Sequence, residues 1–455
     1  MTYILETYGC QMNKAESSAL EILLREHGWK PAADGDEADL AVINTCSVRA
    51  TAENRAWGRI DLFAAAKRER ASAGKRPLAL VVTGCMAERL KDDMRARQPA
   101  VDYVVGTFQK QAFGLLLDSI ERGKRLEEID ESPVFAFSSS YYEPGSFRSF
   151  VPIMHGCDNF CSYCIVPYIR GREVSRSPSS ILTEIAALEG SGVRELTLLG
   201  QNVNSYSWPG EAAAPDEVDR KGLDFPGLLR LISRSLGSRG SGGLRWIRFL
   251  TSHPKDLSDE LIRVLAEDPL YCRHVHLCVQ SGSNAVLSAM NRRYGREDYL
   301  SLVDRMKASV PGLSLSTDIL VGFPGETEED LGLTLDLMRR VGYTYSYMYH
   351  FNPREGTPAA SLPGRIQDKV KRERLARVIE LQKSLTKSLM ESRVGAVDEV
   401  LVESLSKRRK SEVLGRTQRD EMVVFPAPAS RVGGFAKVRL LSLSGNTFRA
   451  EELAP

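Results

Sequence analysis

Short apolar segments alternate with helical patterns over most of the chain, and this alternation restricts the fold to the α/β class. In the first segment, strand patterns cover residues 3–7, 39–44 and 78–83, and a helical pattern follows each one. Strands that alternate with helices form parallel sheets, because each helix returns the chain to the same edge of the sheet. The sequence therefore predicts an N-terminal parallel α/β domain.

The alternation resumes after a turn- and serine-rich stretch and predicts a second, barrel-like domain. Six strand patterns lie at residues 150–154, 195–199, 246–250, 274–279, 313–320 and 346–351. Six β/α units are too few for a complete eight-unit barrel, so we expect a partial (β/α)6 barrel. From residue 396, five short strand patterns predict a small antiparallel β-barrel. The expected domains are residues 1–130, 149–385 and 386–455, with a linker at 131–148.

Composition limits the class of protein. Eight cysteines in 455 residues are too few for a disulfide scaffold. No basic region precedes an apolar stretch at the N-terminus, and no run approaches the roughly 18 apolar residues that span a membrane. We therefore expect a cytoplasmic protein without membrane contact, whose clustered cysteines hold metal. The net charge of +2 excludes a wholly basic protein that coats nucleic acid. Local basic patches could still bind RNA.

Three of the cysteines recur in the same local context. Cys10, Cys46 and Cys85 each follow a predicted strand and precede a helical pattern. One such cysteine alone is typical of a packed core. Ligands of an open parallel sheet gather outside the carboxyl ends of its strands, so three in this position are expected to meet at one edge.

Three further cysteines lie on one short loop. Cys157, Cys161 and Cys164 form a C-x3-C-x2-C pattern directly after the first strand of the predicted barrel. Three thiolates on a tight loop can hold three irons of a 4Fe–4S cube and leave the fourth iron open to a substrate or cofactor. Zinc is the main competitor, but structural zinc usually takes four ligands, and no second C-x2-C occurs in the chain.

The residues around both cysteine sets resemble those of the methylthiotransferases, a family of the radical S-adenosylmethionine (SAM) superfamily. The matching segments are Tyr8–Asn13, Asn44–Arg49, Gly84–Arg89, Ile153–Glu173, Leu198–Asn204, Thr317–Thr327 and Val402–Thr417. The resemblance covers nearly the whole chain. It implies an N-terminal methylthiotransferase domain with an auxiliary cluster, a central radical SAM barrel and a C-terminal TRAM domain, which is an RNA-binding barrel.

The resemblance implies two 4Fe–4S clusters and SAM as cofactors. Cys157, Cys161 and Cys164 would hold the SAM-cleaving cluster, and Cys10, Cys46 and Cys85 a second cluster that carries or donates sulfur. The Gly-Cys-Gln-Met-Asn form of the first motif is most similar to members that act on tRNA. The implied reaction adds a methylthio group to C2 of N6-isopentenyladenosine at position 37 of the anticodon loop. A radical is needed there because the aromatic C–H bond is not activated.

Six other residues are expected near SAM. They are Tyr163, Gly200, Gln201, Asn202, Ser316 and Asp318. Tyr163 lies between two cluster cysteines, and the remaining five lie on or after barrel strands. Aromatic packing, a bare turn and a structural strand position are the competing interpretations for these residues.

Basic residues predict a track for RNA. The expected contacts are Arg170, Arg172, Arg176, Arg292, Arg293, Lys407, Arg408, Arg409 and Lys410. A charge run is commonly just a solvated face, but the run at 407–410 lies in the TRAM-like region. It also follows a basic helix at 365–394 that carries nine Lys or Arg and four Asp or Glu. Arginine stacks on bases and binds phosphates.

One position departs from the family pattern. The chain has Cys278 where the family usually has proline, in the segment His276–Gly282. Proline fixes φ and removes a backbone donor, whereas cysteine does neither. We expect Cys278 and Cys272 to serve as packing residues.

Alternative functions remain open from the sequence. Within the family, the substrate could be threonylcarbamoyladenosine in tRNA or an aspartate of a ribosomal protein. A different class would be a non-enzymatic RNA-binding protein with a structural metal. The expected partners are a tRNA anticodon stem-loop with an isopentenylated adenosine and an electron donor such as flavodoxin or ferredoxin. The chain is expected to be a monomer.

Metal content separates these classes. Two 4Fe–4S sites predict about eight irons per chain with matching sulfide after anaerobic reconstitution. Iron and sulfide analysis of the desalted protein checks this number. A sample that holds zinc, or no more than one cluster, would favour the non-enzymatic class.

Overall fold

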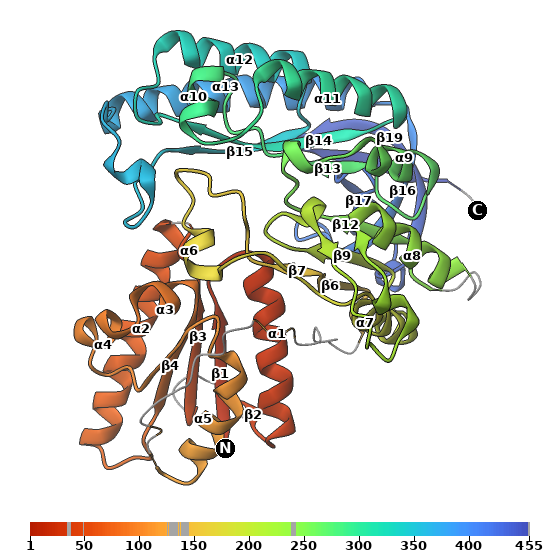
Figure 1. The fold of residues 1–455 in the computed structure, drawn as a ribbon. Coiled ribbons are helices and arrows are strands. Elements are labelled where there is room, and N and C mark those ends of the chain that lie inside the picture. Colours follow the sequence, from red (N-terminus) through yellow and green to blue (C-terminus); the bar gives the residue numbers. More distant parts are fainter. Residues whose placement is uncertain are drawn as a thin grey trace.

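The computed structural model describes residues 1–33, 38–48, 50–124, 126, 135, 137, 145–237 and 243–453. Figure 1 shows an N-terminal α/β domain below a larger α/β domain, with the C-terminal strands behind the larger domain. The expected linker at 131–148 lies largely outside the described residues.

The N-terminal domain is a parallel five-stranded sheet covered by helices on both faces. Its strands are β1 (Thr2–Thr7), β2 (Lys30–Pro31), β3 (Leu40–Thr45), β4 (Ala79–Gly84) and β5 (Tyr103–Val105), in the order β2-β1-β3-β4-β5. Its helices are α1 (Gln11–Glu26), α2 (Ala50–Ser72), α3 (Cys85–Leu90), α4 (Asp92–Arg97) and α5 (Phe113–Glu121), with the 3-10 turn η2 (Lys110–Ala112). All six residues of β3 are buried, as the continuous apolar run of a strand covered on both faces requires.

The central domain is the expected partial barrel of six parallel strands. They are β6 (Arg148–Pro152), β9 (Glu195–Leu199), β12 (Trp246–Phe249), β13 (His274–His276), β14 (Ser314–Val321) and β15 (Tyr345–His350). They form two three-stranded sheets, β12-β9-β6 and β13-β14-β15. Isolated parallel bridges, Ile247 with Tyr271 and Ser252 with Leu277, join the sheets along β12 and β13.

Helices cover the outside of this barrel (Figure 1). They are α7 (Pro178–Gly190), α8 (Phe225–Gly237), α9 (Asp259–Glu267), α10 (Asn284–Ala289), α11 (Arg296–Ser309), α12 (Glu328–Val341) and α13 (Asp368–Glu391). The short helix α6 (Val166–Arg170) lies between the barrel and the N-terminal domain. Two short hairpins, β7 (Met154–His155) with β8 (Val174–Ser175) and β10 (Ser207–Trp208) with β11 (Leu223–Asp224), extend from the connections. The 3-10 turns are η3 (Val203–Ser205), η4 (Glu217–Arg220), η5 (Pro254–Asp256), η6 (Pro358–Ser361) and η7 (Ala429–Arg431).

The C-terminal domain is a closed five-stranded barrel. Its strands are β16 (Val397–Leu405), β17 (Glu412–Thr417), β18 (Met422–Pro426), β19 (Phe435–Ser444) and β20 (Thr447–Glu452), in the order β16-β17-β18-β20-β19. Four of the five pairings are antiparallel, as expected, and β18 pairs with β20 in parallel.

The two outer domains pack against opposite ends of the central barrel strands. Met12 and Ala15 of α1 pack on Leu199, the last residue of β9. At the other end, Trp246, the first residue of β12, meets Phe435 of β19 edge to face at 4.8 Å between ring centroids. The N-terminal domain therefore lies at the carboxyl end of the barrel, where ligands bind in such folds.

No helix in the described part of the chain is long and apolar enough to cross a membrane.

A buried arginine secures the C-terminal barrel. Arg248 Nε donates to Glu195 Oε2 at 2.8 Å, and its Nη2 donates to the Thr417 carbonyl at 2.7 Å. Arg248→Met would remove both buried hydrogen bonds and leave the buried Glu195 carboxylate with Arg148 as its remaining partner, so we expect the free energy of unfolding to fall by about 3 kcal/mol. Anaerobic urea denaturation measures the change.

Arg245→Met provides the matched control. Arg245 pairs with Glu399 across the same interface, but its side chain is 47% exposed. An exposed pair contributes less than about 1 kcal/mol. Equal losses in the two variants would contradict the importance of the buried contact.

Candidate functional site

The loop that carries Cys157, Cys161 and Cys164 turns sharply after β7. Gly156 adopts φ +80°, and a Cβ atom there would lie 2.0 Å from the Arg172 carbonyl oxygen. Only glycine fits such a left-handed, close-packed position. The turn directs the cysteine loop into the space at the carboxyl end of the barrel.

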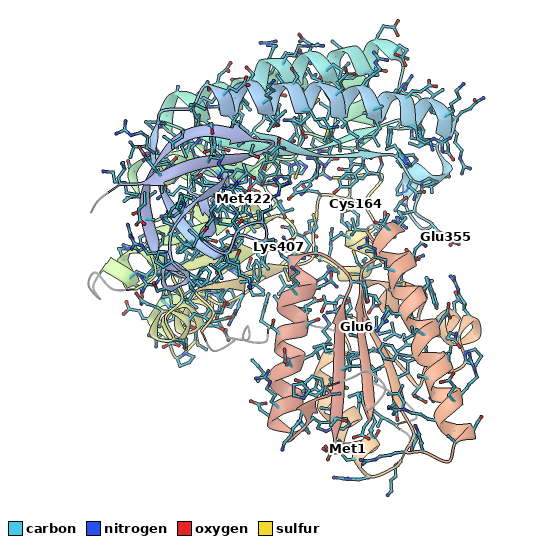
Figure 2. The ribbon with its side chains drawn as sticks, turned by 180° about the vertical axis from the view of Figure 1, so that it is seen from behind. Met1, Glu6, Cys164, Glu355, Lys407 and Met422 are labelled. Carbon is cyan, nitrogen blue, oxygen red and sulfur yellow. The ribbon has the colours of Figure 1, made fainter. Side chains whose placement is uncertain are left out.

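Hydrogen bonds hold the loop in shape. Ser162 N–H donates to the Met290 carbonyl at 3.0 Å, and Ser162 Oγ donates to the Ala289 carbonyl at 2.8 Å. Cys164 N–H donates to the Cys161 carbonyl at 2.9 Å. Figure 2 shows Cys164 in the region between the N-terminal and central domains.

The three thiols of this loop share one electrostatic environment. Burial raises the pKa of the Cys164 thiol to about 12, and nearby Cys161 and Cys157 raise it further. Burial also raises the pKa of Cys157 to about 11. A thiol binds metal as the thiolate, so the site needs a positive group close to all three sulfurs. Iron is such a group, and Arg292 adds one hydrogen bond from Nη1 to Cys161 Sγ at 3.3 Å.

Buried polar groups of the site fit a polar cofactor. The buried atoms without a hydrogen-bond partner among the described residues include two acceptors, Asn159 Oδ1 and Gln201 Oε1, and one donor, His155 Nε2. Nε2 carries the proton of the His155 ring because Arg170 Nη1 donates to Nδ1. Each unpaired buried group costs about 1–3 kcal/mol, and a bound polar ligand removes that cost. The thiols and these polar groups together fit a [4Fe–4S] cluster with SAM.

The second triad forms at the carboxyl edge of the N-terminal sheet. Cys10, Cys46 and Cys85 follow β1, β3 and β4, which are neighbours in the sheet. Burial raises the pKa of the Cys85 thiol to about 11, and Cys46 and Cys10 also raise it. The structure therefore brings the three cysteines together, as the strand-end pattern predicts.

One buried arginine connects the second triad to the central domain. Arg170 of α6 donates from Nε to Cys85 Sγ at 3.3 Å and from Nη1 to Glu16 Oε1 at 2.9 Å. Nη1 also lies 3.4 Å from Nδ1 of His155, two residues before Cys157. Arg170 is 3% exposed and contacts groups on both sides of the domain boundary.

Glu16 balances this positive charge. Burial raises the pKa of its carboxyl group, but Arg170 and Lys110 outweigh burial and lower that pKa to about 2. Lys110 Nζ lies 2.8 Å from Glu16 Oε2. The carboxylate is therefore ionised at neutral pH and holds both cations at the edge of the triad.

Two of the residues expected near SAM hold the turn after β9. A Cβ atom on Gly200 would lie 2.4 Å from Met154 Cγ, so the turn packs tightly on β7. Asn202 Nδ2 donates to Asp256 Oδ2 at 2.8 Å, and Asn202 Oδ1 accepts from His253 N–H at 3.1 Å. Gly200 and Asn202 shape the turn that carries the unpaired Gln201.

The other three lie on the cysteine loop and on β14. The Tyr163 hydroxyl oxygen lies 3.5 Å from Arg292 Nη1. Ser316 Oγ lies 2.9 Å from His276 Nδ1, and Asp318 Oδ2 lies 3.3 Å from His276 Nε2. Ser316 and Asp318 thus belong to one hydrogen-bonded group inside the barrel.

The expected RNA track needs a correction. Arg170, Arg176 and Arg292 are 3%, 4% and 3% exposed, and each guanidinium is bound inside the protein. Arg176 pairs with the equally buried Glu184. These arginines stabilise buried acceptors and thiols, so they do not present a surface to RNA.

The remaining basic candidates are on the surface. Arg172, with its side chain 71% exposed, lies 3.4 Å from Asp158, and Arg293 and residues 407–410 are also exposed. Figure 2 shows Lys407 on the side of the small barrel that faces the N-terminal domain. The basic helix at 365–394 corresponds to α13, where Arg374 is buried and paired with Glu326.

Several site residues escaped the sequence reasoning. Glu16, Lys110 and His155 gather around Arg170 although they lie far apart in the chain. Tyr347 and Tyr349 of β15 are 45% and 38% exposed. One signal was available: Glu16 directly follows Ala15 on the buried side of α1, where an acid needs a partner.

Comparison with family models supports the three domains. Residues 2–106 match "Uncharacterized protein family UPF0004", residues 151–338 match the "Radical SAM superfamily" and residues 391–452 match the "TRAM domain". The matches confirm the expected radical SAM barrel and TRAM barrel.

Curated relatives match over the full length. Proteins named tRNA-2-methylthio-N(6)-dimethylallyladenosine synthase from Treponema pallidum (strain Nichols) and Treponema denticola are 49% and 47% identical, over 99% of this chain and 98% and 99% of theirs. The chain belongs to this synthase family. A further family member, from Moorella thermoacetica, is 40% identical over 96% of this chain and 95% of its own length. The synthase family confirms the expected methylthiotransferase resemblance and, with the radical SAM match, the expected SAM and [4Fe–4S] cofactors.

Solved structures support the fold. A radical SAM methyltransferase, TsrM from Kitasatospora setae, has a TM-score of 0.57 at 16% identity, over 79% of this chain and 77% of its own. The radical SAM enzyme OxsB has a TM-score of 0.51 at 13% identity, over 84% of this chain and 56% of its own. Both likenesses concern the fold alone.

The Arg170–Glu16 pair generates a prediction. Arg170→Met leaves the Glu16 carboxylate buried with only Lys110 for compensation, so we expect a loss of about 3–5 kcal/mol in unfolding free energy. Anaerobic urea denaturation of the cluster-loaded protein measures it. Arg172→Met is the control, because its exposed ion pair with Asp158 contributes less than about 1 kcal/mol. An Arg170 variant as stable as the control would show that the buried pair is not needed.

Proposed function

We propose that this protein is a radical SAM methylthiotransferase that adds a methylthio group to C2 of N6-isopentenyladenosine at position 37 of tRNA. The observation that carries the proposal is the pair of cysteine triads at the mouth of the barrel, with Arg170 between Cys85 of one triad and His155, two residues before Cys157 of the other. Membership of the synthase family supports the same reaction.

The two triads have different neighbours, which suits different tasks. Cys157, Cys161 and Cys164 lie on the loop that carries the unpaired acceptor of Asn159 and would hold the cluster that binds SAM. Cys10, Cys46 and Cys85 would hold the auxiliary cluster. When bound, the clusters and SAM supply the radical and the sulfur that the reaction at C2 requires.

The chain's own residues position these groups. Arg170 and Arg292 donate to Cys85 Sγ and Cys161 Sγ, which stabilises the thiolate form of each sulfur. Gln201 Oε1, which is buried without a hydrogen-bond partner, would accept a hydrogen bond from the amino group of SAM. Gly156 and Gly200 let the backbone pack closely around the site, which excludes water from it.

The substrate base must leave its stack to reach the barrel interior. A base in a single-stranded loop is unstacked at low cost, and it stacks readily on exposed aromatic rings. Tyr347 and Tyr349 on β15 present such rings. Arg172, Arg293 and residues 407–410 would bind the phosphates of the anticodon stem-loop.

The chemistry also requires a source of electrons. Radical SAM chemistry consumes electrons, so we propose an electron donor such as flavodoxin or ferredoxin. We propose that the protein acts as a monomer in the cytoplasm, where tRNA and such donors occur. We also propose domain boundaries near residues 130, 149 and 386.

Nucleoside analysis tests the reaction. In tRNA from a strain that lacks the gene, we expect 2-methylthio-N6-isopentenyladenosine to disappear and N6-isopentenyladenosine to accumulate. Mass spectrometry of digested tRNA measures both. An unchanged level of the methylthio nucleoside would overturn the proposal, and loss of a methylthiolated threonylcarbamoyladenosine would favour that substrate instead.

Single cysteine variants test the division of labour. We expect Cys157→Ala to abolish the formation of 5′-deoxyadenosine. We expect Cys10→Ala to retain SAM cleavage but to stop methylthiolation. Each variant should lose about four of eight irons. Methylthiolation at the wild-type rate by the Cys10 variant would contradict the auxiliary assignment.

Salt dependence tests the RNA surface. Replacing Lys407, Arg408, Arg409 and Lys410 with glutamine should weaken tRNA binding and reduce the slope of log K against log salt by about 2–3. The control replaces Arg122 and Lys124, which are exposed at the opposite edge of the N-terminal domain. A slope that changes equally in both variants would show that residues 407–410 make no specific contact.

A further inference from the structure

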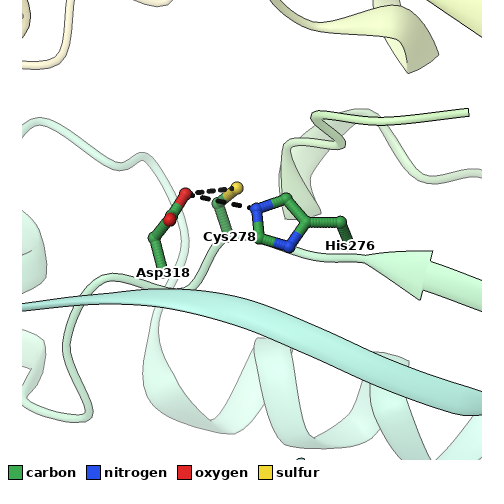
Figure 3. Close-up of side chains that lie close together, drawn as sticks. All are labelled: His276, Cys278 and Asp318. Atoms are coloured by element: carbon green, nitrogen blue, oxygen red, sulfur yellow. Dashed lines mark hydrogen bonds and ion pairs between the residues drawn. The ribbon is translucent and has the colours of Figure 1, made fainter. Parts of the chain in front are cut away.

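Three metal-ligating side chains meet inside the central barrel, apart from the six cysteines of the triads. His276 ends β13, Cys278 follows it by two residues, and Asp318 lies on the neighbouring β14. One ligand atom from each lies within 4.8 Å of the other two. Figure 3 shows the three side chains pointing toward one another. Asp318 Oδ2 lies 3.1 Å from Cys278 Sγ and 3.3 Å from His276 Nε2.

Ser316 fixes the orientation of the His276 imidazole through the ring nitrogen that faces away from Asp318. Its Nδ1 lies 2.9 Å from Ser316 Oγ, and the same hydroxyl lies 2.9 Å from His274 Nε2. A metal-binding histidine usually has its other ring nitrogen held in this way. Nε2 pairs with the Asp318 carboxylate, and a metal ion would take the place of the proton between them.

The backbone on each side of the thiol is also fixed. Cys278 N–H donates to the Ser252 carbonyl at 3.2 Å, and the Cys278 carbonyl accepts from Arg292 Nη2. Gln280 N–H donates to the Asp318 carbonyl at 2.9 Å, which ties the segment after β13 to β14. A proline at 278 would lack the first of these donors. Cys278 therefore does more than fill space: its thiol is held against a carboxylate.

We propose that His276, Cys278 and Asp318 bind one divalent metal ion of the zinc class. Thiolate, imidazole and carboxylate are ordinary zinc ligands, and bonds of about 2.0–2.3 Å in a tetrahedral site place ligand atoms about 3.4–3.6 Å apart. The present separations of 3.1 and 3.3 Å need to open by only a few tenths of an ångström. Three protein ligands leave a fourth position for water or a polar ligand.

The environment allows the ion to enter and to be retained. His276 and Cys278 are each 7% exposed, which shields the site. The Asp318 side chain is 26% exposed and provides the route in. Binding releases two protons to solvent, one from the Cys278 thiol and one from His276 Nε2, and involves no change of oxidation state. Asp318 is also one of the residues expected near SAM, so the ion would lie in the part of the barrel that the reaction proposed above uses. Zinc uptake is measured without turnover, so it is tested separately from that reaction.

The experiment uses the cluster-loaded protein, so that the six triad cysteines are occupied by iron. The protein is incubated anaerobically with one equivalent of zinc chloride, desalted and analysed for zinc and iron. We expect about one zinc per chain in the wild type and less than about a tenth in Cys278→Ala. Cys272→Ala is the matched control, because Cys272 is equally buried but lies outside the group, and it should retain the zinc.

Iron content and zinc X-ray absorption distinguish loss of the zinc site from misfolding of the variant. Iron equal to the wild type shows that Cys278→Ala retains its fold. Should it lose iron, the zinc edge of the wild type decides the question without any substitution, with one sulfur at about 2.3 Å and the remaining ligands nitrogen or oxygen. The proposal is overturned by a wild type that holds no zinc, by equal zinc in folded Cys278→Ala, or by a zinc site with no sulfur or with several.

Discussion

The buried pair of Arg170 and Glu16 determines how the two halves of the catalytic region fit together. A guanidinium that is 3% exposed requires a compensating anion, and α1 of the N-terminal domain supplies it. The same guanidinium donates to Cys85 and lies beside His155, so one side chain connects the second cysteine triad to the strand that leads into the first. Because both charges are buried, removal of either one would leave the other uncompensated and would destabilise the fold.

A second arginine repeats this arrangement deeper in the barrel. Arg292 donates to Cys161 and to the Cys278 carbonyl, and so connects the first triad to the group formed by His276, Cys278 and Asp318. Positive charge near a thiol favours its thiolate form, which is the form that binds metal. Several arginines of this protein therefore bind groups inside it and are not available on its surface.

Much of the architecture could be predicted from the sequence. The six barrel strands, the two triads and the five-stranded C-terminal barrel all appear where apolar runs and turn residues place them. The arginines were harder, because local sequence does not say which way a long charged side chain points. Arg170 and Arg172 are two residues apart, yet one is buried against Glu16 and the other is exposed beside Asp158.

The sequence alone determined the class of fold and the six cysteines, because strand periodicity and cysteine spacing are local properties of the chain. Only the tertiary structure decided the partners of the buried charges. Glu16 and Arg170 are 154 residues apart in the chain, and Cys278 and Asp318 are 40 apart. Such pairs form because parallel strands end at one edge and because a buried charge or thiol requires a partner, wherever in the sequence that partner lies.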